Sequence, residues 1–268
     1  MNLDFLLKLA LDASHKACKA ILKEKQKLEI WQKDDGSPLS SADLASNEIL
    51  CDELGKSDIA VCSEEKPLNF NERKNLPYFW LIDPLDGTKS FIKGSDEYCI
   101  LIALIAHTRP ILSLIAKPSV QDFYYAHAQS KLYKNDSVLA VDEELFLTEQ
   151  KTALISTHHS SPLNQAFLEK NSFTPKKVSS ALKFITLLDG KAGIYHRFEN
   201  LHSWDIAAGD FLLNKSGGFM GKFSQNHLKN YKNSTFLSSD FISYNEENFL
   251  CPHFVAVSRQ EFLKEIIL

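Results

Sequence analysis

The stretch Trp80–Thr88, which reads W-L-I-D-P-L-D-G-T, constrains this chain more than any other part of its sequence. The apolar run Tyr78–Ile82 is short and bounded by turn residues, which predicts a buried strand. Pro84 has a fixed φ and no N–H group, so we expect strand pairing to stop there. The carboxylates of Asp83 and Asp86 would then lie on a rigid bend at the end of a sheet.

This bend has two interpretations. Carboxylates that lie so close repel each other unless a cation sits between them or one is protonated. Gly87 allows a tight backbone path, and Thr88 is predicted to cap a following helix, whose N-terminus would attract anions. The alternative is an ordinary strand-ending turn, because Asp and Gly are common turn formers. The rest of the chain is needed to choose between them.

Composition excludes several classes of protein. The chain has 268 residues, 44% of them hydrophobic, which is enough for one large domain or two smaller ones. Its net charge of −4 argues against general affinity for nucleic acids. The apolar stretch 5–10 is interrupted by a lysine and reads as a helix face, and no apolar run is long enough to span a membrane.

The cysteines and the helix-like stretch near the N-terminus predict a cytoplasmic protein, with a peripheral association with the inner membrane left open. The five cysteines are scattered and show no C-x-x-C pair, which is typical of reduced thiols: Cys18, Cys51, Cys62, Cys99 and Cys251. The sequence predicts no particular oligomeric state.

The pattern of apolar residues predicts an α/β (α+β) protein. Helices are expected over 3–25, 40–54, 162–169, 180–188, 205–215 and 262–268. Strands are expected at 59–62, 78–82, 98–106, 111–116, 122–127, 153–156, 192–197 and 254–257. Short connections in the first half predict an antiparallel sheet, and the second half alternates strands with helices. We therefore divide the chain into halves 1–145 and 146–268 that form one catalytic unit.

Acidic residues recur at strand ends and helix starts. Glu64 follows the strand at 59–62, and Asp205 stands in H-S-W-D-I-A-A-G at the start of a helix. Taken singly, each acid can be explained as part of a solvated turn or as a favourable charge at a helix N-terminus. Together with Asp83 and Asp86 they would form an oxygen-only site, which suits Mg²⁺ or Mn²⁺ and not zinc.

These motifs resemble a known family. D-P-L-D-G-T at 83–88, S-E-E at 63–65 and W-D-I-A-A-G at 204–209 resemble the inositol monophosphatase superfamily, which implies Mg²⁺-dependent, lithium-inhibited phosphatases with a layered αβαβα sandwich fold. D-P-L-D-G-T-K-S-F-I-K-G at 83–94 and S-A-L-K-F at 180–184 are similar to its 3′(2′),5′-bisphosphate nucleotidase branch, of the CysQ type.

The resemblance implies roles for individual residues. Two to three Mg²⁺ ions would be held by Glu64, Asp83, the Leu85 carbonyl, Asp86 and Asp205. Catalytic roles would belong to Asp43 and Thr88, which orient the attacking water, and to Glu65 behind the ligands. The substrate would contact Gly87, Thr88, Lys89, His159, Ser180, Lys183 and Arg197. Two departures from the pattern are Ser63, where the superfamily commonly has glycine, and Ser179-Ser180-Ala181, where the branch often has Gly-Ser-Ser.

The chemistry fits this interpretation. Two metal ions can activate a water and stabilise the leaving oxygen of a phosphate monoester, so no covalent nucleophile is required. No G-x-S-x-G motif is present. A second phosphate needs its own cations, which Lys183 and Arg197 supply unless they are ordinary surface charges.

The predicted function is a Mg²⁺-dependent phosphatase that converts adenosine 3′,5′-bisphosphate to AMP and phosphate. A second predicted substrate is 3′-phosphoadenylyl sulfate. One alternative is an inositol monophosphate or fructose 1,6-bisphosphate phosphatase of the same fold. Another is a non-catalytic regulator that binds metal or nucleotide. The expected partner is thus a small nucleotide bisphosphate.

Overall fold

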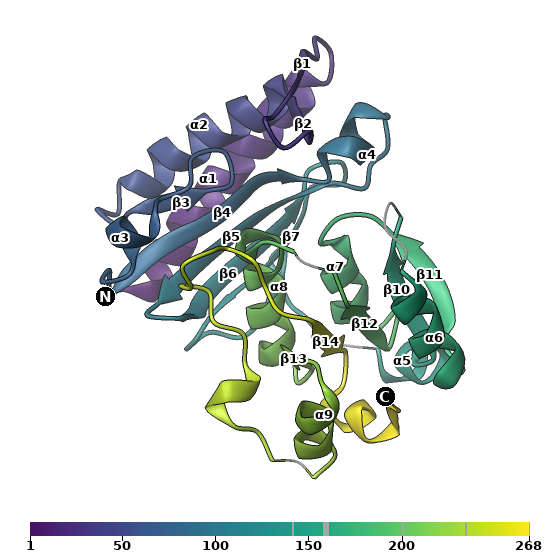
Figure 1. Cartoon of the computed structure of the whole chain (residues 1–268). Coiled ribbons are helices and arrows are strands. Elements are labelled where there is room, and N and C mark those ends of the chain that lie inside the picture. Colours follow the sequence, from purple (N-terminus) through teal and green to yellow (C-terminus); the bar gives the residue numbers. More distant parts are fainter. Residues whose placement is uncertain (141, 158–160, 200, 234, 268) are drawn as a thin grey trace.

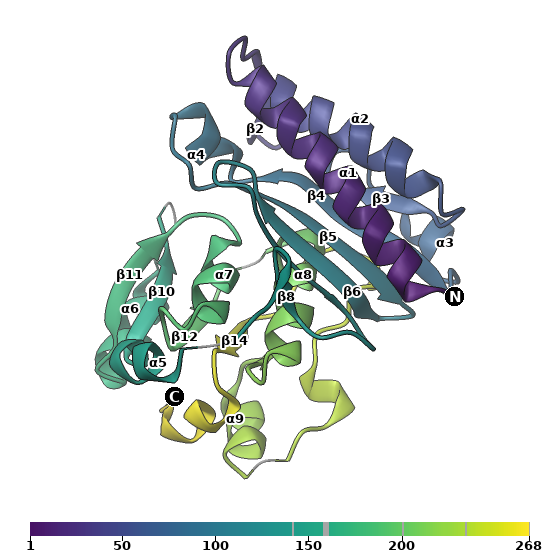
Figure 2. The same cartoon turned by 180° about the vertical axis from the view of Figure 1, so that it is seen from behind.

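Helices and sheets alternate through the molecule in five layers, as the computed structural model shows (Figures 1 and 2). The structure describes residues 1–140, 142–157, 161–199, 201–233 and 235–267. In this part of the chain the order of layers is helix, sheet, helix, sheet, helix, as the predicted αβαβα sandwich requires.

The first layer consists of two long helices, α1 (Leu3–Glu24) and α2 (Ser41–Gly55). They form because small and apolar residues recur along one face; Ala10, Ala13 and Ala17 of α1 are fully buried. The short hairpin of β1 (Ile30–Gln32) and β2 (Pro38–Ser40) connects the two helices.

Seven strands of the described chain form the first sheet, in sequence order from β3 to β9. Only the β3–β4 pair is parallel. The strands are β3 (Val61–Ser63), β4 (Tyr78–Asp86), β5 (Cys99–Ala106), β6 (Arg109–Lys117), β7 (Asp122–His127), β8 (Tyr133–Lys134) and β9 (Ser137–Val138).

The continuous apolar runs in this sheet arise because helices cover both of its faces. Along β5, Ile100, Ile102 and Leu104 pack with α1 and α2. The alternate residues Leu101 and Ala103 pack with the helices of the middle layer on the opposite face. Successive strand residues point to opposite faces, so a strand between two helical layers is apolar throughout.

The middle layer contains α7 (Leu182–Leu188) and α8 (Ser203–Lys215). They approach closely at Gly209, where an added Cβ would lie 2.2 Å from the Phe184 ring. The small residues of the W-D-I-A-A-G motif therefore allow close helix packing, as the sequence predicts.

Five strands of the described chain form the second sheet, in the order β11, β10, β12, β14, β13. Their bounds are β10 (Thr152–Ser156), β11 (Thr174–Val178), β12 (Ile194–Arg197), β13 (Phe219–Lys222) and β14 (Phe254–Val257). The outer layer and connections contain α3 (Phe70–Arg73), α4 (Thr88–Ile92), α5 (Glu143–Glu149), α6 (Pro162–Lys170), α9 (Gln225–Lys232), η1 (Ser238–Asp240) and η2 (Gln260–Glu265).

Several element boundaries differ from the sequence predictions. Strand β4 continues past Pro84, because pairing skips from Asp83–Leu101 to Asp86–Cys99 across an irregularity instead of ending. Helix α7 begins at Leu182 and not at residue 180, since Ser180 has a φ of +56°. Helix α8 begins at Ser203, two residues earlier than predicted.

The predicted helix over 262–268 is wrong. A 3₁₀ helix, η2, occupies Gln260–Glu265, and the chain then becomes extended. The Asn171 side chain accepts from the Ile267 N–H at 2.6 Å and donates to the Ile267 carbonyl at 2.8 Å. These bonds between Ile267 and the distant Asn171 take the place of helical hydrogen bonds. The local sequence could not predict them, because Asn171 lies far away in the chain.

Two further predictions concern the molecule as a whole. All five cysteines are unpaired, as predicted. No helix in the described ranges is both long and apolar enough to cross a bilayer. The division at residues 145 and 146 falls inside α5 and remains a prediction.

Candidate active site

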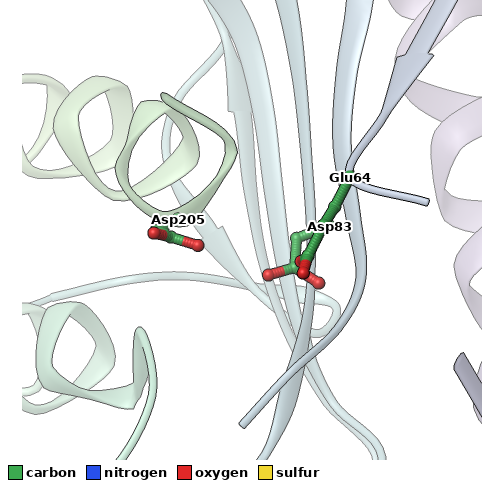
Figure 3. A group of neighbouring side chains, drawn as sticks. All are labelled: Glu64, Asp83 and Asp205. Carbon is green, nitrogen blue, oxygen red and sulfur yellow. The ribbon is translucent and has the colours of Figure 1, made fainter. Parts of the chain in front are cut away.

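Three acids from distant parts of the sequence meet between the two sheets. Glu64 follows β3, Asp83 lies in β4, and Asp205 is the third residue of α8. One carboxylate oxygen from each lies within 4.8 Å of the others. Figure 3 shows Glu64 and Asp83 side by side, with Asp205 facing them from the start of the helix.

The electrostatics of this cluster favour a bound cation. Burial raises the pKa of Asp83 and of Asp205 well above the ordinary range, and neighbouring carboxylates including Glu64 raise both further. A divalent ion would relieve this repulsion, and oxygen-only ligands within one coordination sphere suit Mg²⁺. The residues therefore fit the metal that the sequence predicted.

Asp86 lies in the wall of the same cavity but outside the cluster of three. Its Oδ2 atom accepts a hydrogen bond from the Ala181 N–H, at the start of α7. Burial raises the pKa of Asp86 to about 6, although the Ala181 N–H and then Lys183 oppose this effect. One carboxylate oxygen of Asp86, a predicted metal ligand, is thus already hydrogen-bonded to the backbone.

The Leu85 backbone lies between the predicted ligands and the predicted catalytic pair. Its N–H donates to Asp83 Oδ1 at 3.0 Å. Its carbonyl oxygen lies 3.1 Å from the Thr88 hydroxyl. The Ser46 hydroxyl of α2 donates a hydrogen bond to the preceding Pro84 carbonyl at 2.7 Å, and this bond fixes the bend to α2.

Thr88 and Asp43 form the predicted catalytic pair. The Thr88 hydroxyl lies 2.9 Å from Asp43 Oδ1, and the other oxygen of Asp43 accepts from the Ser40 N–H at 2.9 Å. Asp43 is 2% exposed, and burial raises its pKa. Thr88 was expected to cap the helix that follows, but it is the first residue of α4 and Gly87 is the N-cap; the Thr88 hydroxyl bonds Asp43.

Gly87 is fixed by two constraints. Its φ is +97°, which L residues rarely adopt. A Cβ there would lie 2.8 Å from the Glu97 carbonyl oxygen and 3.1 Å from the Ser180 Cβ. Glycine therefore lets the segment 179–181 of the second half approach the bend.

A cavity of about 280 Å³ lies beside Glu64, Asp86, Gly87, Thr88 and Asp205. Its walls come from both halves: Ser37, Pro38, Glu64, Asp86, Gly87, Thr88, Lys89, Ser156, Ser179, Ser180, Ala181, Lys183, Phe184, Tyr195, Arg197, Leu201 and Asp205. Most of the predicted metal and substrate residues therefore share one cavity. Asp43, Glu65, Asp83 and Leu85 are not among these walls, and His159 lies outside the described residues.

Two buried cations face this cavity from the second half. Lys183 is 4% exposed and donates to the carbonyls of Ser180 at 2.6 Å and Val178 at 3.1 Å. Burial lowers the pKa of Lys183 to about 8, although Asp86 opposes this effect. Arg197 is 6% exposed, and its Nε lies 3.1 Å from Glu199. Both side chains are therefore built into the fold and are not solvated surface charges.

Sequence reasoning missed a lysine at the site. Lys33 Nζ lies 2.8 Å from Glu64 Oε1 and 2.8 Å from Glu65 Oε1. Burial lowers the pKa of Lys33, but the two carboxylates outweigh this effect and raise the pKa overall. Burial also raises the pKa of Glu65. No motif marks Lys33, because a hairpin loop brings it to the acids.

The serine that replaces glycine before the two glutamates also has a role. The Ser63 hydroxyl donates to Asn47 Oδ1 of α2 at 2.6 Å and accepts from the Glu65 N–H at 3.2 Å. This side chain ties the acidic turn to α2. The signal available in the sequence was the departure from the family pattern itself.

Comparison with known proteins shows the family to which this chain is related. A model of the inositol monophosphatase family matches residues 2–259. The 3′(2′),5′-bisphosphate nucleotidase CysQ of Buchnera aphidicola subsp. Acyrthosiphon pisum is 34% identical over 255 residues, which cover 89% of this chain and 92% of the relative. The protein of the same name from Escherichia coli O6:H1 is 31% identical over 219 residues, covering 80% and 88%.

Solved structures show the same fold. CysQ from Bacteroides thetaiotaomicron, described as a bacterial member of the inositol monophosphatase family, matches with a TM-score of 0.76 and 25% identity, covering 96% of this chain and 100% of that one. A staphylococcal inositol monophosphatase-1 in a LiCl-soaked inhibitory complex matches with a TM-score of 0.77 and 18% identity, covering 99% and 95%. The predicted fold is thus confirmed. The chain belongs to the inositol monophosphatase family and is an enzyme, a phosphatase of that superfamily.

Proposed function

We propose that this phosphatase removes the 3′-phosphate of adenosine 3′,5′-bisphosphate, with Mg²⁺, and also acts on 3′-phosphoadenylyl sulfate. The observation that carries the proposal is the pair Lys183 and Arg197, buried in the cavity wall and contributed by the half opposite Glu64 and Asp83. A substrate with two phosphates would use both these cations and the acidic cluster. The names of the curated relatives agree with this substrate class.

The chain's own residues have separable tasks in this reaction. Glu64, Asp83, Asp86, Asp205 and the Leu85 carbonyl would hold two to three Mg²⁺ ions. When bound, these ions would activate a water and neutralise the phosphoryl oxygens. Asp43 would accept a hydrogen bond from Thr88 and so orient the Thr88 hydroxyl toward that water. The N–H groups beside Gly87 would bind the scissile phosphate.

The cavity wall contributed by the second half would bind the second phosphate. Arg197 would grip it bidentately, and Lys183 and Ser180 would complete the subsite. Neutral sugar hydroxyls would gain little from two buried cations, so this wall favours a bisphosphate. Lys89, which is exposed at the mouth, would attract either substrate without discriminating between them.

A substrate panel tests the proposal. Phosphate release is measured with Mg²⁺ on adenosine 3′,5′-bisphosphate, 3′-phosphoadenylyl sulfate, inositol 1-phosphate and fructose 1,6-bisphosphate. We expect the highest kcat/KM on the adenosine bisphosphate. Faster turnover of inositol 1-phosphate or fructose 1,6-bisphosphate would reassign the substrate, and no release from any of them would favour a non-catalytic regulator.

A matched pair of arginine variants locates the second-phosphate subsite. Arg197→Met should raise KM for the adenosine bisphosphate at least tenfold, because a charge-assisted phosphate contact is lost. KM for inositol 1-phosphate should change little. Arg259→Met is the control, since Arg259 pairs with Glu143 away from the cavity. Equal effects of Arg197→Met on both substrates would contradict the assignment.

Two further properties belong to the proposal. We expect millimolar lithium to inhibit the enzyme, in keeping with the lithium-soaked staphylococcal structure described above. Five free thiols agree with a cytoplasmic location. Assays with LiCl against a KCl control test the first property.

A further inference from the structure

Glu199 lies next to Arg197, the arginine that would bind the second phosphate. Strand β12 ends at Arg197, and Glu199 follows two residues later. Its Oε2 atom lies 3.1 Å from Arg197 Nε, and its Oε1 atom accepts a hydrogen bond from the Asn164 side-chain amide of α6 at 2.7 Å. These three side chains, here called the arginine support, connect the cavity wall to α6.

Helix α6 fixes the segment that carries Glu199 at two neighbouring points. Besides the bond from Asn164, the Phe198 ring packs against Phe167 of α6 and against Phe223, with both pairs of ring centroids 5.7 Å apart. Closely packed rings have few alternative positions. The Glu199 carboxylate is therefore held in place, although its side chain is 28% exposed.

The contact with Glu199 uses the inner nitrogen of the Arg197 guanidinium. Within the described chain this is the one ion pair that Arg197 makes. Arg197 lines the cavity, whereas Glu199 is not among its walls. A guanidinium held at Nε keeps its two terminal nitrogens, with their parallel N–H groups, for a bidentate contact with phosphate. The arginine support therefore orients Arg197 for such a ligand.

Two other charges act on Arg197 from the cavity. Burial and then Asp86 raise the pKa of Asp205, and Arg197 opposes this effect, so Asp205 attracts the guanidinium. Burial lowers the pKa of Lys183 to about 8, and Arg197 adds to this decrease, so the lysine repels the guanidinium. A long, flexible side chain would shift under these charges unless a fixed partner held it. Glu199 is that partner.

We propose that Glu199, held by Asn164, is a positioning residue that keeps the terminal nitrogens of Arg197 directed at the second phosphate of the substrate. The inference rests on the proposed function, because it needs the second-phosphate subsite. A different role for Glu199 would be only to neutralise Arg197. The two roles predict opposite effects. Removing a carboxylate that only neutralises would strengthen the binding of an anionic substrate, whereas removing a positioning residue weakens it.

Steady-state kinetics with Mg²⁺ on adenosine 3′,5′-bisphosphate and inositol 1-phosphate test the positioning role. Glu199→Ala should raise KM for the bisphosphate roughly three- to tenfold, because binding must now order a long side chain. Its kcat should stay unchanged, as should both constants for inositol 1-phosphate. Glu169→Ala is the control, since Glu169 is an exposed acid of α6 that bonds Gln165 and lies outside the cavity walls.

The conservative variant Glu199→Gln separates shape from charge. Its amide oxygen can accept from Arg197 Nε while its NH₂ group donates to Asn164 Oδ1, a buried atom without a hydrogen-bond partner in the described chain. We therefore expect the KM of Glu199→Gln to stay within about twofold of the wild type. A fall in KM in both Glu199→Ala and Glu199→Gln would show that Glu199 only neutralises Arg197, and would overturn the inference.

A double-mutant cycle shows whether Glu199 acts through Arg197. In Arg197→Met, adding Glu199→Ala should leave KM unchanged, because the side chain to be positioned is gone. A further rise of the same size in the double variant would overturn the inference, even where Arg197→Met alone supported the subsite. If Arg197→Met did not raise KM for the bisphosphate, the proposed function would fail and the inference with it.

Discussion

Asp83 is the most deeply buried of the three clustered acids, which makes it the sharpest test of the metal site. Asp83→Asn keeps the size of the side chain and removes a negative charge that the neighbouring carboxylates repel. We expect phosphatase activity with Mg²⁺ to disappear and the metal-free protein to gain about 1 kcal/mol in free energy of unfolding. Urea unfolding in EDTA, run beside the activity assay, checks both. Near-normal turnover would show that the cluster is not the metal site.

Gly87 tests the geometry of the bend independently of charge. Gly87→Ala introduces a Cβ 2.8 Å from a backbone oxygen at a φ of +97°. We expect a loss of about 2–4 kcal/mol in free energy of unfolding, together with most of the activity. Gly94→Ala is the matched control: its φ is +77°, but nothing lies within 4 Å of the new Cβ. It should lose only about 1 kcal/mol and keep its activity.

At the scale of elements, β12 carries a buried histidine that should make the fold sensitive to acid. The His196 ring is 2% exposed and packs between Phe167 and Phe198, with ring centroids 4.4 Å and 5.2 Å away. Burial lowers the pKa of His196 to about 3. Between the ordinary histidine pKa and this value the unfolded chain takes up a proton that the folded chain does not, so stability falls as pH falls.

The test compares wild type with His196→Phe in urea unfolding without metal. On lowering the pH from 7.5 to 5, the wild type should lose about 2 kcal/mol more than the variant, because the pKa difference acts over roughly 1.5 pH units. Carboxylates titrate in both proteins, so the difference isolates the histidine. The exposed His15 provides the control as His15→Gln, and an identical pH profile for His196→Phe and wild type would refute the explanation.

The sequence could predict elements whose pattern is local. The strands of the first sheet are predictable because layers on both faces make them apolar throughout, and α1 because its buried residues repeat at helical spacing. The pairing of Asp86 with Cys99 beyond Pro84 was not predictable, since a partner strand determines it. The same is true of the extended C-terminal residues, which are held by Asn171.

The candidate site divides in the same way. Glu64, Asp83 and Asp205 stand in motifs and could be named from the sequence, and the structure brings them together. Lys33 could not be named, because a hairpin some thirty residues away from Glu64 delivers it to the acids. The residues that sequence reasoning missed are those that reach the site through tertiary contacts.

At the scale of the whole molecule, α8 connects the two sheets and contributes to the site. Asp205 at its start faces acids of the first half. One turn and a half further on, Asp210 is fully buried. It accepts hydrogen bonds from Arg109 Nη1 at 2.6 Å, Arg109 Nη2 at 2.9 Å and the Tyr244 hydroxyl at 2.6 Å. The same helix thus carries Asp210, which is paired with an arginine, and Asp205, which accepts a hydrogen bond from the His202 N–H and faces two other acids.

This contrast predicts different responses to Mg²⁺. An ion that binds only the folded chain stabilises it by mass action, and at one hundred times the dissociation constant the gain is about 2.7 kcal/mol. For a chain of this length we expect saturating Mg²⁺ to raise Tm by roughly 5 °C over the value in EDTA. Asp205→Asn should abolish that shift and leave the Tm in EDTA unchanged or higher, because it removes a carboxylate that Asp86 and Glu64 repel.

Asp210→Asn is the matched control on the same helix. It removes the charge that Arg109 needs, so the Tm in EDTA should fall by several degrees. The rise in Tm on adding Mg²⁺ should persist, since Asp210 does not contribute to the acid cluster. Differential scanning calorimetry of the three proteins, with EDTA and with Mg²⁺, separates the two roles. A full Mg²⁺ shift in Asp205→Asn would mean that the ion does not join the two halves through α8.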